Sequence, residues 1–563
     1  MGAFPKASAA AGVCRNTWLL LELDRMGENE IREAHAQEFA DELDLLLRAR
    51  GVHFLIGAGV SMVAPTGLPS GMELLRSALD VCVTDPEPRQ HLAFVTKAER
   101  WERIVPELVF QRVQDAIGAL PPEPYEAMFH AQPNRLHARL AQELDTGRAS
   151  VSTTNFDRLI SSQSRTERDP LHLHGHIGDL PQMTATIRQV GRGLPRELEN
   201  QFVDRVRSAS ALVVFGYSGN DADIMSAVLA ARPARVLWVV RSRDDRAVEN
   251  LSAYPELRAD IVKVDLGELA RIWGVTQVTN SPSSRASAED RVSVSLGRQY
   301  EIVVGCLQLL DEYEQSFGAA EEVLRLRGVS PEVGGVLALA SQALNKLDRQ
   351  EEARQLAAEG LRVAEEDDHL RCRLLLQRGL AEIDMLPPEV DAAIRDFERA
   401  ADIARDLFEA GITDDRSLQG MALHNLGYAQ TVSFLESGDE APLRRAAEYY
   451  EQAIEVKRQA GDLRYLVTSC RNLAGVLLAL GKDADAARPL SEFLTLTDRY
   501  SLVWDRAYFD ALCATLFQRA GRPAEAMARA RVALDQFASM PDQASMVAQM
   551  RAILERGGEL AKP

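Results

Sequence analysis

The stretch FLIGAGVS, residues 54–61, is the end of a short apolar run that passes directly into a glycine-rich turn. An apolar run of this length, bounded by glycine, indicates a strand that is buried on both faces of a sheet. Helical segments separate it from later runs of the same kind, so the sequence predicts a parallel α/β sheet. The runs are VHFLIG at 52–57, ASVST at 149–153, ALVVFG at 211–216, VLWVV at 236–240 and DIVKV at 260–264.

Helical patterns surround these strands. Apolar residues at near-helical spacing over 30–50, including Phe39 and Leu43, predict an amphipathic helix before the first strand. Residues 80–145 are also mainly helical in pattern and predict an insertion, or cap, over the sheet. The expected N-terminal fold is therefore an α/β domain with a Rossmann-like parallel sheet and a helical insertion.

The strand-like runs stop at a segment rich in Ser, Thr, Asn and Pro, which predicts an interdomain linker. Beyond it the sequence is rich in Ala, Leu, Glu and Arg with helical periodicity, which predicts an all-α domain. The expected division is a disordered or mis-assigned start at 1–28, the α/β domain at 29–273, the linker at 274–290 and the all-α domain at 291–555.

The all-α region repeats one local pattern, a turn followed by an acidic residue and alanine that open a helix. It occurs in DRQEEA at 348–353, GKDADA at 481–486 and GRPAEA at 521–526. Together with HNLGYA at 424–429 and RNLAGV at 471–476, these segments resemble tetratricopeptide repeats. A generic helical bundle is the alternative, because the repeat lengths are irregular, with an insertion near 433–443. Small residues expected where paired helices approach closely are Gly427, Ala474, Ala486 and Ala526.

Composition narrows the class of protein. A chain of 563 residues is too long to form a single hydrophobic core, so two or more domains are expected. A formal charge of -19 without a long Lys/Arg cluster argues against nucleic-acid binding. Six cysteines stand singly, which favours a reducing compartment over a zinc ribbon or a disulfide framework. No apolar run reaches the roughly 18 residues of a membrane helix, and the N-terminal residues lack a signal-peptide core. We therefore expect a soluble cytoplasmic protein.

The glycine turn after the first strand is the first candidate site. Gly57 and Gly59 would let the backbone approach a phosphate closely, and the amides of the following helix would face that charge. Such a turn is by itself equally compatible with a simple tight turn. It is followed by GLPSG at 67–71, and the two segments together are more specific than either alone. The cofactor-binding residues expected here are Gly57, Ala58, Gly59 and Ser61, which would anchor a pyrophosphate, together with Pro69.

Two further loops follow predicted strands at the edge where open α/β sheets bind ligands. In STTNFDRLI, residues 152–160, Asn155 and Asp157 come directly after a strand, although Asp157 is equally placed to cap a helix. In VVFGYSGNDADI, residues 213–224, Gly216, Ser218 and Asp221 follow another strand. Ser218 is a donor for a phosphate or ribose, and Asp221 could instead cap the next helix.

The run PLHLHGHIGD, residues 170–179, places His172, His174 and His176 at alternate positions. On an extended strand the three imidazoles would share one face, which permits a metal site. The run contains no Cys or Glu and no Asp before Asp179, so spacing alone does not supply one.

These motifs resemble those of the sirtuin superfamily. GAGVS with GLPSG resembles the sirtuin nucleotide loop, and the resemblance implies that Asn155 lies beside the nicotinamide ribose while Asp157 organises its loop. A sirtuin-like histidine directly before glycine corresponds to His174, which is then a base or a partner of a ribose hydroxyl. His172 and His176 have no such counterpart and are expected to be a satisfied strand histidine and a solvated loop histidine.

The chain also departs from sirtuin deacylases. It lacks their four zinc cysteines, and Ser70 and Gly71 stand where their Phe-Arg follows the loop proline. The closer resemblance, over roughly residues 30–270, is to bacterial sirtuin-like NAD hydrolases of anti-phage defence. It implies cleavage of NAD to nicotinamide and ADP-ribose, with NAD as substrate and no metal. A non-catalytic NAD or ADP-ribose sensor and a zinc-free deacylase remain as alternatives.

The resemblance also implies a role for each of the two domains. Nicotinamide leaves as a neutral base, so the enzyme needs chiefly positioning and electrostatics at the ribose. The repeats are expected to bind a protein or peptide trigger or to mediate self-association, giving a homo-oligomer. Destroying NAD would stop growth of the infected cell, which is abortive infection. Neither membrane nor nucleic acid is expected as a partner.

Overall fold

The structure is a computed structural model and describes residues 31–48, 51–98, 101, 104–166, 168–243, 245–252, 254, 257–279, 293–364, 366–413, 416–499, 503–537 and 544–560. The predicted start at 1–28 and most of the predicted linker at 274–290 lie outside these residues. The chain forms two compact units. The first contains residues 1–68, 130–179 and 195–283, and the second contains 69–129, 180–194 and 284–563.

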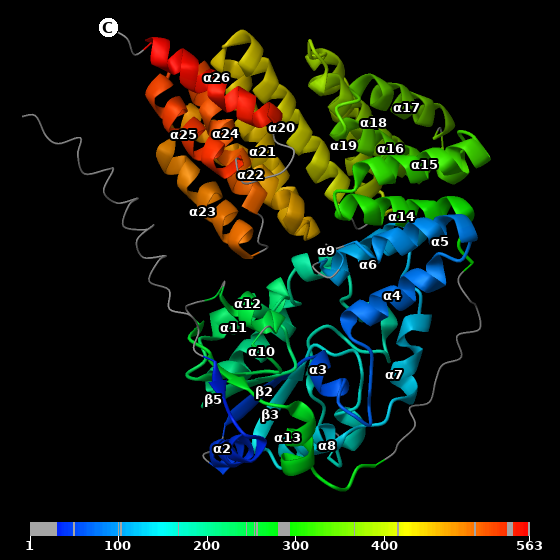
Figure 1. Ribbon diagram of the computed structural model, residues 1–563, viewed down its shortest axis with the longest axis vertical. Helices are drawn as coiled ribbons and strands as arrows, with labels where there is room; N and C mark the ends of the chain where they lie inside the picture. The colour runs from blue at the N-terminus through cyan, green and yellow to red at the C-terminus, as the bar shows by residue number, and fades with distance from the viewer. Residues whose placement is uncertain are drawn as a thin grey trace, which may run out of the picture. The chain divides into compact units, whose positions relative to one another are not determined.

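The first unit is built on a seven-stranded sheet in which every pair of neighbouring strands is parallel. The five predicted strands are confirmed, and two short ones are added to them. The order is β1-β7-β6-β5-β2-β3-β4, so β2 lies between β3 and the central strand β5 (Figure 1). The strands are β1 (Arg32–Glu33), β2 (Val52–Ile56), β3 (Ala149–Thr153), β4 (Leu171–His172), β5 (Ala211–Phe215), β6 (Val236–Val240) and β7 (Asp260–Lys263).

Helices cover both faces of this sheet. One face packs into a core with α2 (Ala36–Arg48), α8 (Arg135–Asp145) and α13 (Leu266–Trp273). On the other face, the buried His53 ring packs edge-to-face with the Phe202 ring of α10 (Arg196–Ser208), and the two ring centroids are 5.6 Å apart. Because both faces are covered, the strands are apolar on both sides, which is why their sequences read as nearly continuous apolar runs.

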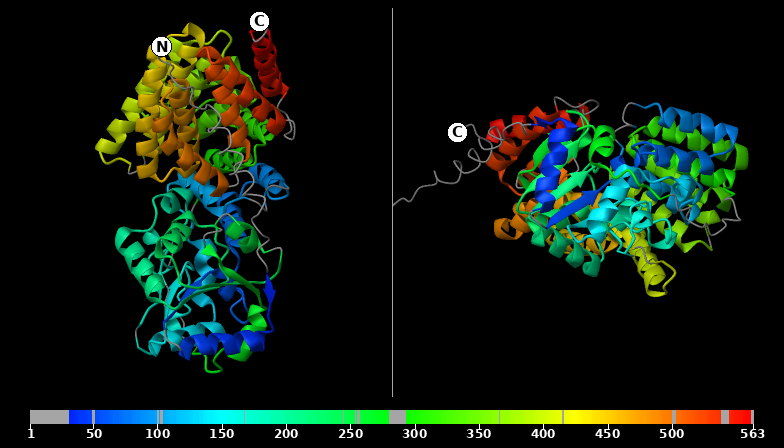
Figure 2. Two further views of the ribbon diagram at one scale, coloured as in Figure 1. Left: turned by 90° about the vertical axis from the view of Figure 1, so that its left-hand side faces the viewer. Right: turned by 90° about the horizontal axis from the view of Figure 1, so that it is seen from below.

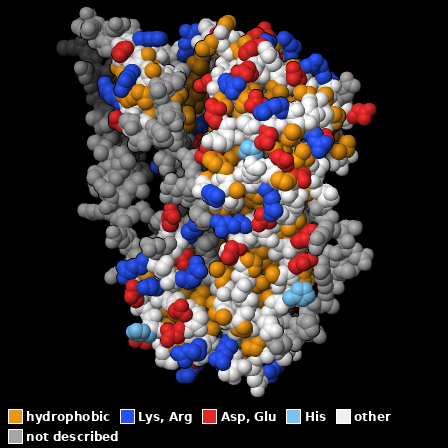
Figure 3. All heavy atoms as spheres, turned by 45° about the vertical axis from the view of Figure 1, so that its right-hand side comes forward, with side chains coloured by type: hydrophobic (Ala, Val, Ile, Leu, Met, Phe, Trp, Pro, Cys, Tyr) orange, Lys and Arg blue, Asp and Glu red, His pale blue; other side chains and the backbone are white. Residues whose placement is uncertain are grey.

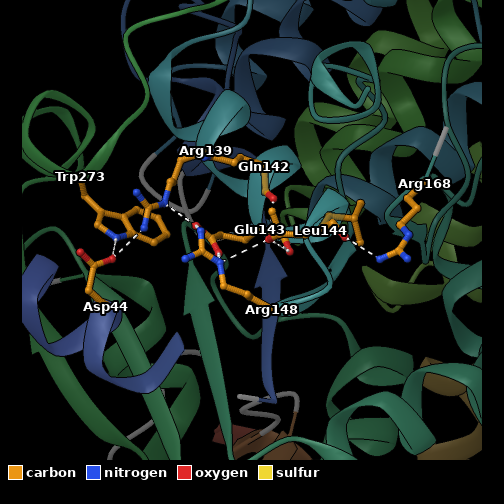
Figure 4. Close-up of polar contacts among 9 residues, drawn as sticks. Asp44, Arg139, Gln142, Glu143, Leu144, Arg148, Arg168 and Trp273 are labelled. Carbon is orange, nitrogen blue, oxygen red and sulfur yellow. Dashed lines mark hydrogen bonds and ion pairs between the residues drawn. The ribbon is translucent and has the colours of Figure 1, made fainter. Parts of the chain in front are cut away.

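An ion-pair network around the buried Glu143 fixes α8 on the first of these faces (Figure 4). Glu143, fully buried, lies 2.8 Å from Arg139 and 2.8 Å from Arg148, which precedes β3. Arg139 also bonds Asp44 of α2 at 2.7 Å and stacks over Trp273 of α13, which donates to the same Asp44 carboxylate at 3.0 Å. The network therefore ties α8 to α2, α13 and the entry to β3.

The second unit is all-helical. Its helices, apart from two long ones described below, are α4 (Gly71–Cys82), α5 (Pro86–Val95), α6 (Pro106–Ile117), α7 (Glu126–His130), α9 (Ile187–Gly191), α14 (Leu296–Leu309), α15 (Tyr313–Arg327), α16 (Gly334–Lys346), α17 (Gln350–Val363), α18 (Asp368–Asp384), α19 (Val390–Glu409), α22 (Leu463–Ala479), α23 (Asp483–Arg499), α24 (Val503–Arg519), α25 (Pro523–Phe537) and α26 (Ala544–Leu560).

This unit includes the segment that the sequence assigned to the α/β domain as an insertion. The helix α14, which begins the C-terminal part, is buried on nearly all sides and packs against α5, α6, α15 and α16. Gln299 on α14 accepts from the amides of Thr84 and Asp85 at 2.8 and 2.9 Å. The boundaries of the compact units thus differ from the predicted 29–273 and 291–555, because the inserted helices bury their apolar faces against α14.

The C-terminal helices lie together in a helical layer (Figure 2), and each packs against its neighbour in the sequence. All three predicted turn-and-helix patterns are confirmed, and their helices begin at Gln350, Asp483 and Pro523. Gly427 is needed for close approach, because a Cβ there would lie 2.8 Å from the Tyr450 ring. The predicted insertion near 433–443 is instead a tight turn between two long helices, α20 (Ser417–Ser437) and α21 (Glu440–Ala460).

The surface of the described residues is of mixed charge. On the face shown in Figure 3, basic and acidic side chains are interspersed and do not separate into one basic and one acidic region. Within the described ranges, no helix has both the length and the apolar character needed to cross a bilayer.

Candidate functional site

The predicted site residues of the first unit follow β2, β3, β4 and β5 at the carboxyl edge of the sheet. Read from β4, the strand order is β4-β3-β2-β5-β6-β7, so the chain winds in one direction from β2 and then in the other from β5. Sheets with such a reversal bind a dinucleotide outside the carboxyl ends of the strands on either side of it. The topology therefore defines where a ligand fits.

The loops after β2 and β5 touch each other through glycine. Gly57 N donates to the carbonyl of Phe215 and Gly59 N to that of Gly216, both at 2.9 Å. A Cβ on Gly57 would lie 2.5 Å from the Gly216 oxygen, and one on Gly59 would lie 2.6 Å from the Gly216 Cα. Gly216 itself has a φ of +61°. The three glycines are thus required for this backbone contact between loops.

This contact differs from the expected phosphate cradle. The amides of Gly57 and Gly59 donate inside the protein, and Val60 N donates to Gly57 O at 3.2 Å, so these groups do not face a ligand. Ala58, the first residue of α3 (Ala58–Ser61), is exposed. The expected contact between this turn and a phosphate stays a prediction.

Ser61 is the centre of a buried polar network. Its hydroxyl donates to Asp157 Oδ2 at 2.7 Å and accepts from Asn155 Nδ2 at 3.1 Å. Its third contact is His137 Nε2, at 3.1 Å. With one donor and two acceptors in use, the hydroxyl is saturated. Ser61 thus holds the residues after β3 in place, while its predicted contact with a phosphate stays a prediction.

His137 and Asn134 belong to this network but were not among the predicted residues. Asn134 caps α8, and its backbone amide donates to His137 Nδ1 at 3.0 Å. The accepting Nδ1 leaves the ring proton on Nε2, which then donates to Ser61. Burial lowers the pKa of His137 to about 4, so the ring is neutral at pH 7. The available sequence signal was the spacing of Asn134 and His137, which is that of a helix-capping box.

Asn155 is held from two sides. Its backbone amide donates to Thr153 Oγ1 at 3.0 Å, and its side-chain amide donates to Ser61. The side-chain oxygen, Oδ1, is buried and has no hydrogen-bond partner among the described residues. A buried acceptor without a donor is costly, so Oδ1 calls for a hydroxyl or a water from outside the protein.

Asp157 organises the loop after β3. Its Oδ1 accepts from Leu159 N at 3.1 Å while Oδ2 accepts from Ser61. No α-helix starts at this position, since residues 161–163 form only a short 3-10 turn. Asp157 therefore stabilises a turn together with the position of Ser61.

His174 does not share a strand face with its neighbours, because β4 ends at His172. Its Nε2 lies 3.1 Å from Oδ2 of Asp223, and both side chains are buried. Asp223 is in the first turn of α11 (Ala222–Ala231) and was not predicted from the sequence. A carboxylate accepts a hydrogen bond, which places the proton of a neutral imidazole on Nε2 and makes Nδ1 an acceptor. The Asp223 carboxylate thus fixes the orientation of the His174 imidazole.

Asp221 lies at the N-cap position of α11, but its side chain makes no capping hydrogen bond. Burial raises the pKa of the Asp221 carboxyl, with Asp223 adding to the effect and His174 opposing it. Asp221 and Asp223 therefore form an acidic pair beside His174.

The other two histidines pair with each other, their ring centroids 5.0 Å apart. His172 Nδ1 lies 3.4 Å from the Asn155 carbonyl oxygen, and burial lowers the pKa of His172 to about 4. Its Nε2 is buried without a hydrogen-bond partner in the described part of the chain, so the ring is not the satisfied histidine expected. His176 accepts from Gly178 N at 3.0 Å and makes a local turn.

Ser218, after β5, lines a hollow of 490 Å³ with Arg241, Ser242, Asp245 and Arg246, which follow β6. The Ser218 carbonyl accepts from Asn250 of α12 (Arg246–Ser252) at 2.8 Å, which fixes this wall.

Pro69, another predicted cofactor-binding residue, begins a segment of the second compact unit. It directly precedes Ser70, which caps α4 through a capping box with Glu73.

No group of three or more His, Cys, Asp or Glu is arranged to hold a metal ion among the residues that the structure describes. His174 is turned to Asp223, while His172 and His176 face each other. The predicted absence of a metal stays a prediction.

No protein-family model matches the chain, and no curated protein matches it. Among solved structures, a Sir2 homolog in complex with NAD is similar over 43% of this chain and 96% of its own, with 18% identity and a TM-score of 0.28. Sir2 in complex with the inhibitor EX-527, 2'-O-acetyl-ADP-ribose and a deacetylated p53 peptide is similar over 41% and 96%, with 20% identity and a TM-score of 0.25. A Rap protein complexed with competence and sporulation factor is similar over 47% and 75%, with 13% identity and a TM-score of 0.35. Function is therefore inferred from the described residues and their contacts.

Proposed function

We propose that this protein is an NAD glycohydrolase that cleaves NAD to nicotinamide and ADP-ribose without a metal. The observation that carries the proposal is Asn155, whose buried Oδ1 lacks a donor among the described residues while Ser61 holds its amide. The residue lies at the carboxyl edge of β3, one strand away from the reversal in strand order, where a dinucleotide fits.

The chemistry needs little beyond this arrangement. The bond between ribose C1' and the nicotinamide nitrogen breaks, the electron pair neutralises the cationic ring, and the oxygen of a water bonds to C1'. The water loses one proton, so the products are nicotinamide, ADP-ribose and a proton. Asn155 Oδ1 accepts from the water or from a ribose hydroxyl, which positions it. His174, oriented by Asp223, accepts a proton from a ribose hydroxyl or from that water.

The test is nicotinamide release from NAD by the purified full-length chain, followed by chromatography. Asn155→Ala and His174→Ala should each lower kcat by about 100-fold or more, because each removes a group that acts on the reacting ribose. His176→Ala is the matched control, since the contacts of this histidine are with Gly178 N and the His172 ring, and it should retain activity.

Two results would contradict the proposal. A folded His174→Ala protein that hydrolyses NAD as fast as the wild type would show that His174 is not the base. No nicotinamide release by the wild type, with or without extract of phage-infected cells, would refute hydrolysis. NAD binding without turnover would then identify the chain as an NAD-sensing module.

We further propose that hydrolysis serves anti-phage defence by depleting NAD, which rests on the motif resemblance. Cells expressing the wild type should lose NAD after infection and yield fewer plaques, whereas cells expressing Asn155→Ala should do neither. Equal NAD concentrations and equal plaque counts in the two kinds of cell would contradict this role.

The helical unit is proposed to bind a protein or peptide trigger or to assemble copies of the chain. Truncation after residue 275 is unsuited to a test, because it removes α14 and uncovers α5 and α6. Light scattering of the full chain with and without infected-cell extract tests it, and an unchanged mass together with unchanged activity would oppose it.

A further inference from the structure

Two buried polar atoms of the candidate site lack a hydrogen-bond partner among the described residues. One is Oδ1 of Asn155, on which the proposed function rests, and the other is Nε2 of His172. The chemistry proposed above makes no use of His172, although this residue ends β4 beside the loop that carries Asn155. A molecule that bonds to both atoms would make His172 a part of the site.

The surroundings of the His172 ring decide what its Nε2 can do. Its Nδ1 lies 3.4 Å from the Asn155 carbonyl oxygen, which can only accept, so the ring proton is on Nδ1. Burial, with the nearby His176 adding to the effect, lowers the pKa of His172 to about 4, so the ring is neutral at pH 7. The other nitrogen of such a ring has a lone pair and no proton. Nε2 is therefore an acceptor, as Asn155 Oδ1 is.

The backbone fixes His172 beside the residues that follow β3. His172 is paired with Thr153 in the register of β3 and β4, and Leu173 N donates to the Thr153 carbonyl at 2.8 Å. From the side of β2, the Ser61 hydroxyl holds the Asn155 amide. The two acceptors thus belong to residues that are both held in place.

Two neighbouring acceptors call for a molecule with two donor hydrogens. A single ribose hydroxyl has one, whereas a water has two, and a buried water is retained where it has at least two polar partners. We propose that His172 Nε2 and Asn155 Oδ1 hold one water between them, and that this water attacks C1' of the nicotinamide ribose. The attack rests on the proposed function, but the binding of the water does not require turnover.

The arrangement gives each group one part in the reaction. Both hydrogens of the water are engaged, so a lone pair of its oxygen is left for C1'. The bond from C1' to the nicotinamide nitrogen breaks, its electron pair moves to the ring, and the oxygen bonds to C1'. The proton on the side of His172 passes to Nε2 and then to solvent. His174 is then the partner of a ribose hydroxyl.

The first test is a crystal structure of the full-length protein without NAD. We expect an ordered water at hydrogen-bond distance, about 2.7–3.2 Å, from both His172 Nε2 and Asn155 Oδ1. The absence of a water bonded to both atoms would overturn the inference. Such a water in a protein that releases no nicotinamide would support the water site and refute hydrolysis, so the two proposals fail separately.

The second test uses methanol, which can attack in place of water but has only one donor hydrogen. With NAD in aqueous methanol, the ratio of methyl ADP-ribose to ADP-ribose should be about 3- to 10-fold higher for His172→Phe than for the wild type, because the acceptor that methanol leaves unsatisfied is gone. The kcat should fall about 10-fold and the KM for NAD should stay unchanged. His172→Gln, whose side-chain oxygen is again an acceptor, should restore most of the wild-type ratio.

The matched control is His53→Phe. The His53 ring is also buried, with Nδ1 2.7 Å from Ser150 Oγ and Nε2 without a partner in the described part of the chain, but it stands second in β2 and not at the carboxyl edge. This variant should leave the product ratio and the KM unchanged. A raised KM for NAD in His172→Phe, with an unchanged product ratio, would show that His172 binds the ribose diol or the carboxamide of the substrate and would overturn the inference.

Discussion

Replacing Ser61 with alanine removes one oxygen that three buried side chains share. Asp157 Oδ2 loses a donor at 2.7 Å, Asn155 Nδ2 loses an acceptor at 3.1 Å, and His137 Nε2 loses an acceptor at 3.1 Å. A buried group left without a partner costs about 1–3 kcal/mol, so three such losses lower the free energy of unfolding by at least about 3 kcal/mol. Ser61→Ala should also lower kcat, because Asn155 is no longer held.

The assay has to report on the first unit separately, because a chain of two compact units does not unfold in one step. Hydrogen exchange in urea, followed on peptides covering β2 and β3, meets this need. Ser208→Ala is the control, because Ser208 is exposed and donates only to the Arg205 carbonyl. It should change stability by less than about 0.5 kcal/mol.

The outcome separates two roles for Ser61. A serine that binds the pyrophosphate would raise KM for NAD on substitution and leave stability unchanged. A folded Ser61→Ala protein with wild-type protection of β2 and β3 would therefore refute the reasoning from the network.

Four further outcomes follow from the same structure. Glu143→Gln should destabilise the first unit, since Arg139 and Arg148 lose the charge of their buried partner. Because Arg148 is partly exposed, we expect a loss of only about 2–4 kcal/mol in the free energy of unfolding, measured by the exchange protection of α8. Burial lowers the pKa of Lys457 to about 8, so the second unit should become more stable as the pH rises from 8 to about 10, because the unfolded chain keeps this proton to a higher pH; thermal unfolding should show this rise in the wild type and not in Lys457→Met. Burial lowers the pKa of His137 to about 4, so the neutral ring should contribute stability that is fully present above pH 6.5. About 3 kcal/mol of this stability should be lost as the pH falls to 4. The free energy of unfolding from urea titrations should depend less steeply on pH in His137→Gln than in the wild type. Any NAD hydrolysis should persist in chelator, and one tightly held zinc per chain by elemental analysis would contradict the metal-free prediction.

Local pattern was enough to predict the elements of the fold. Apolar runs identified five strands within a residue or so of their ends, and glycine or aspartate turns identified the starts of three repeat helices. These features depend on backbone and burial preferences within a few residues, which is the range over which sequence is informative. The placement of Asn155, Asp157 and Ser218 after strands follows for the same reason.

Contacts between distant segments could not be read in this way. Nothing local to Ser61 shows that it meets His137, 76 residues away, or that His174 faces Asp223 across 49 residues. The glycines of the turn looked like a phosphate cradle, yet their amides are used by the loop after β5. Hydrogen-bond capacity is finite, so only the tertiary partners decide which groups remain free for a ligand.

The inserted helices show the same limit at the scale of the compact units. Their amphipathic pattern, by itself, was compatible with covering the sheet, but the structure groups residues 69–129 with the C-terminal helices, where α5 and α6 pack on α14. The apolar face of a helix shows that the helix packs against something, but it does not identify the partner. The sequence by itself thus determined the strands, the helices and the loops that carry the candidate residues. Only the tertiary structure decided which surfaces pair and, through the partners each polar group finds, which atoms are left to do chemistry.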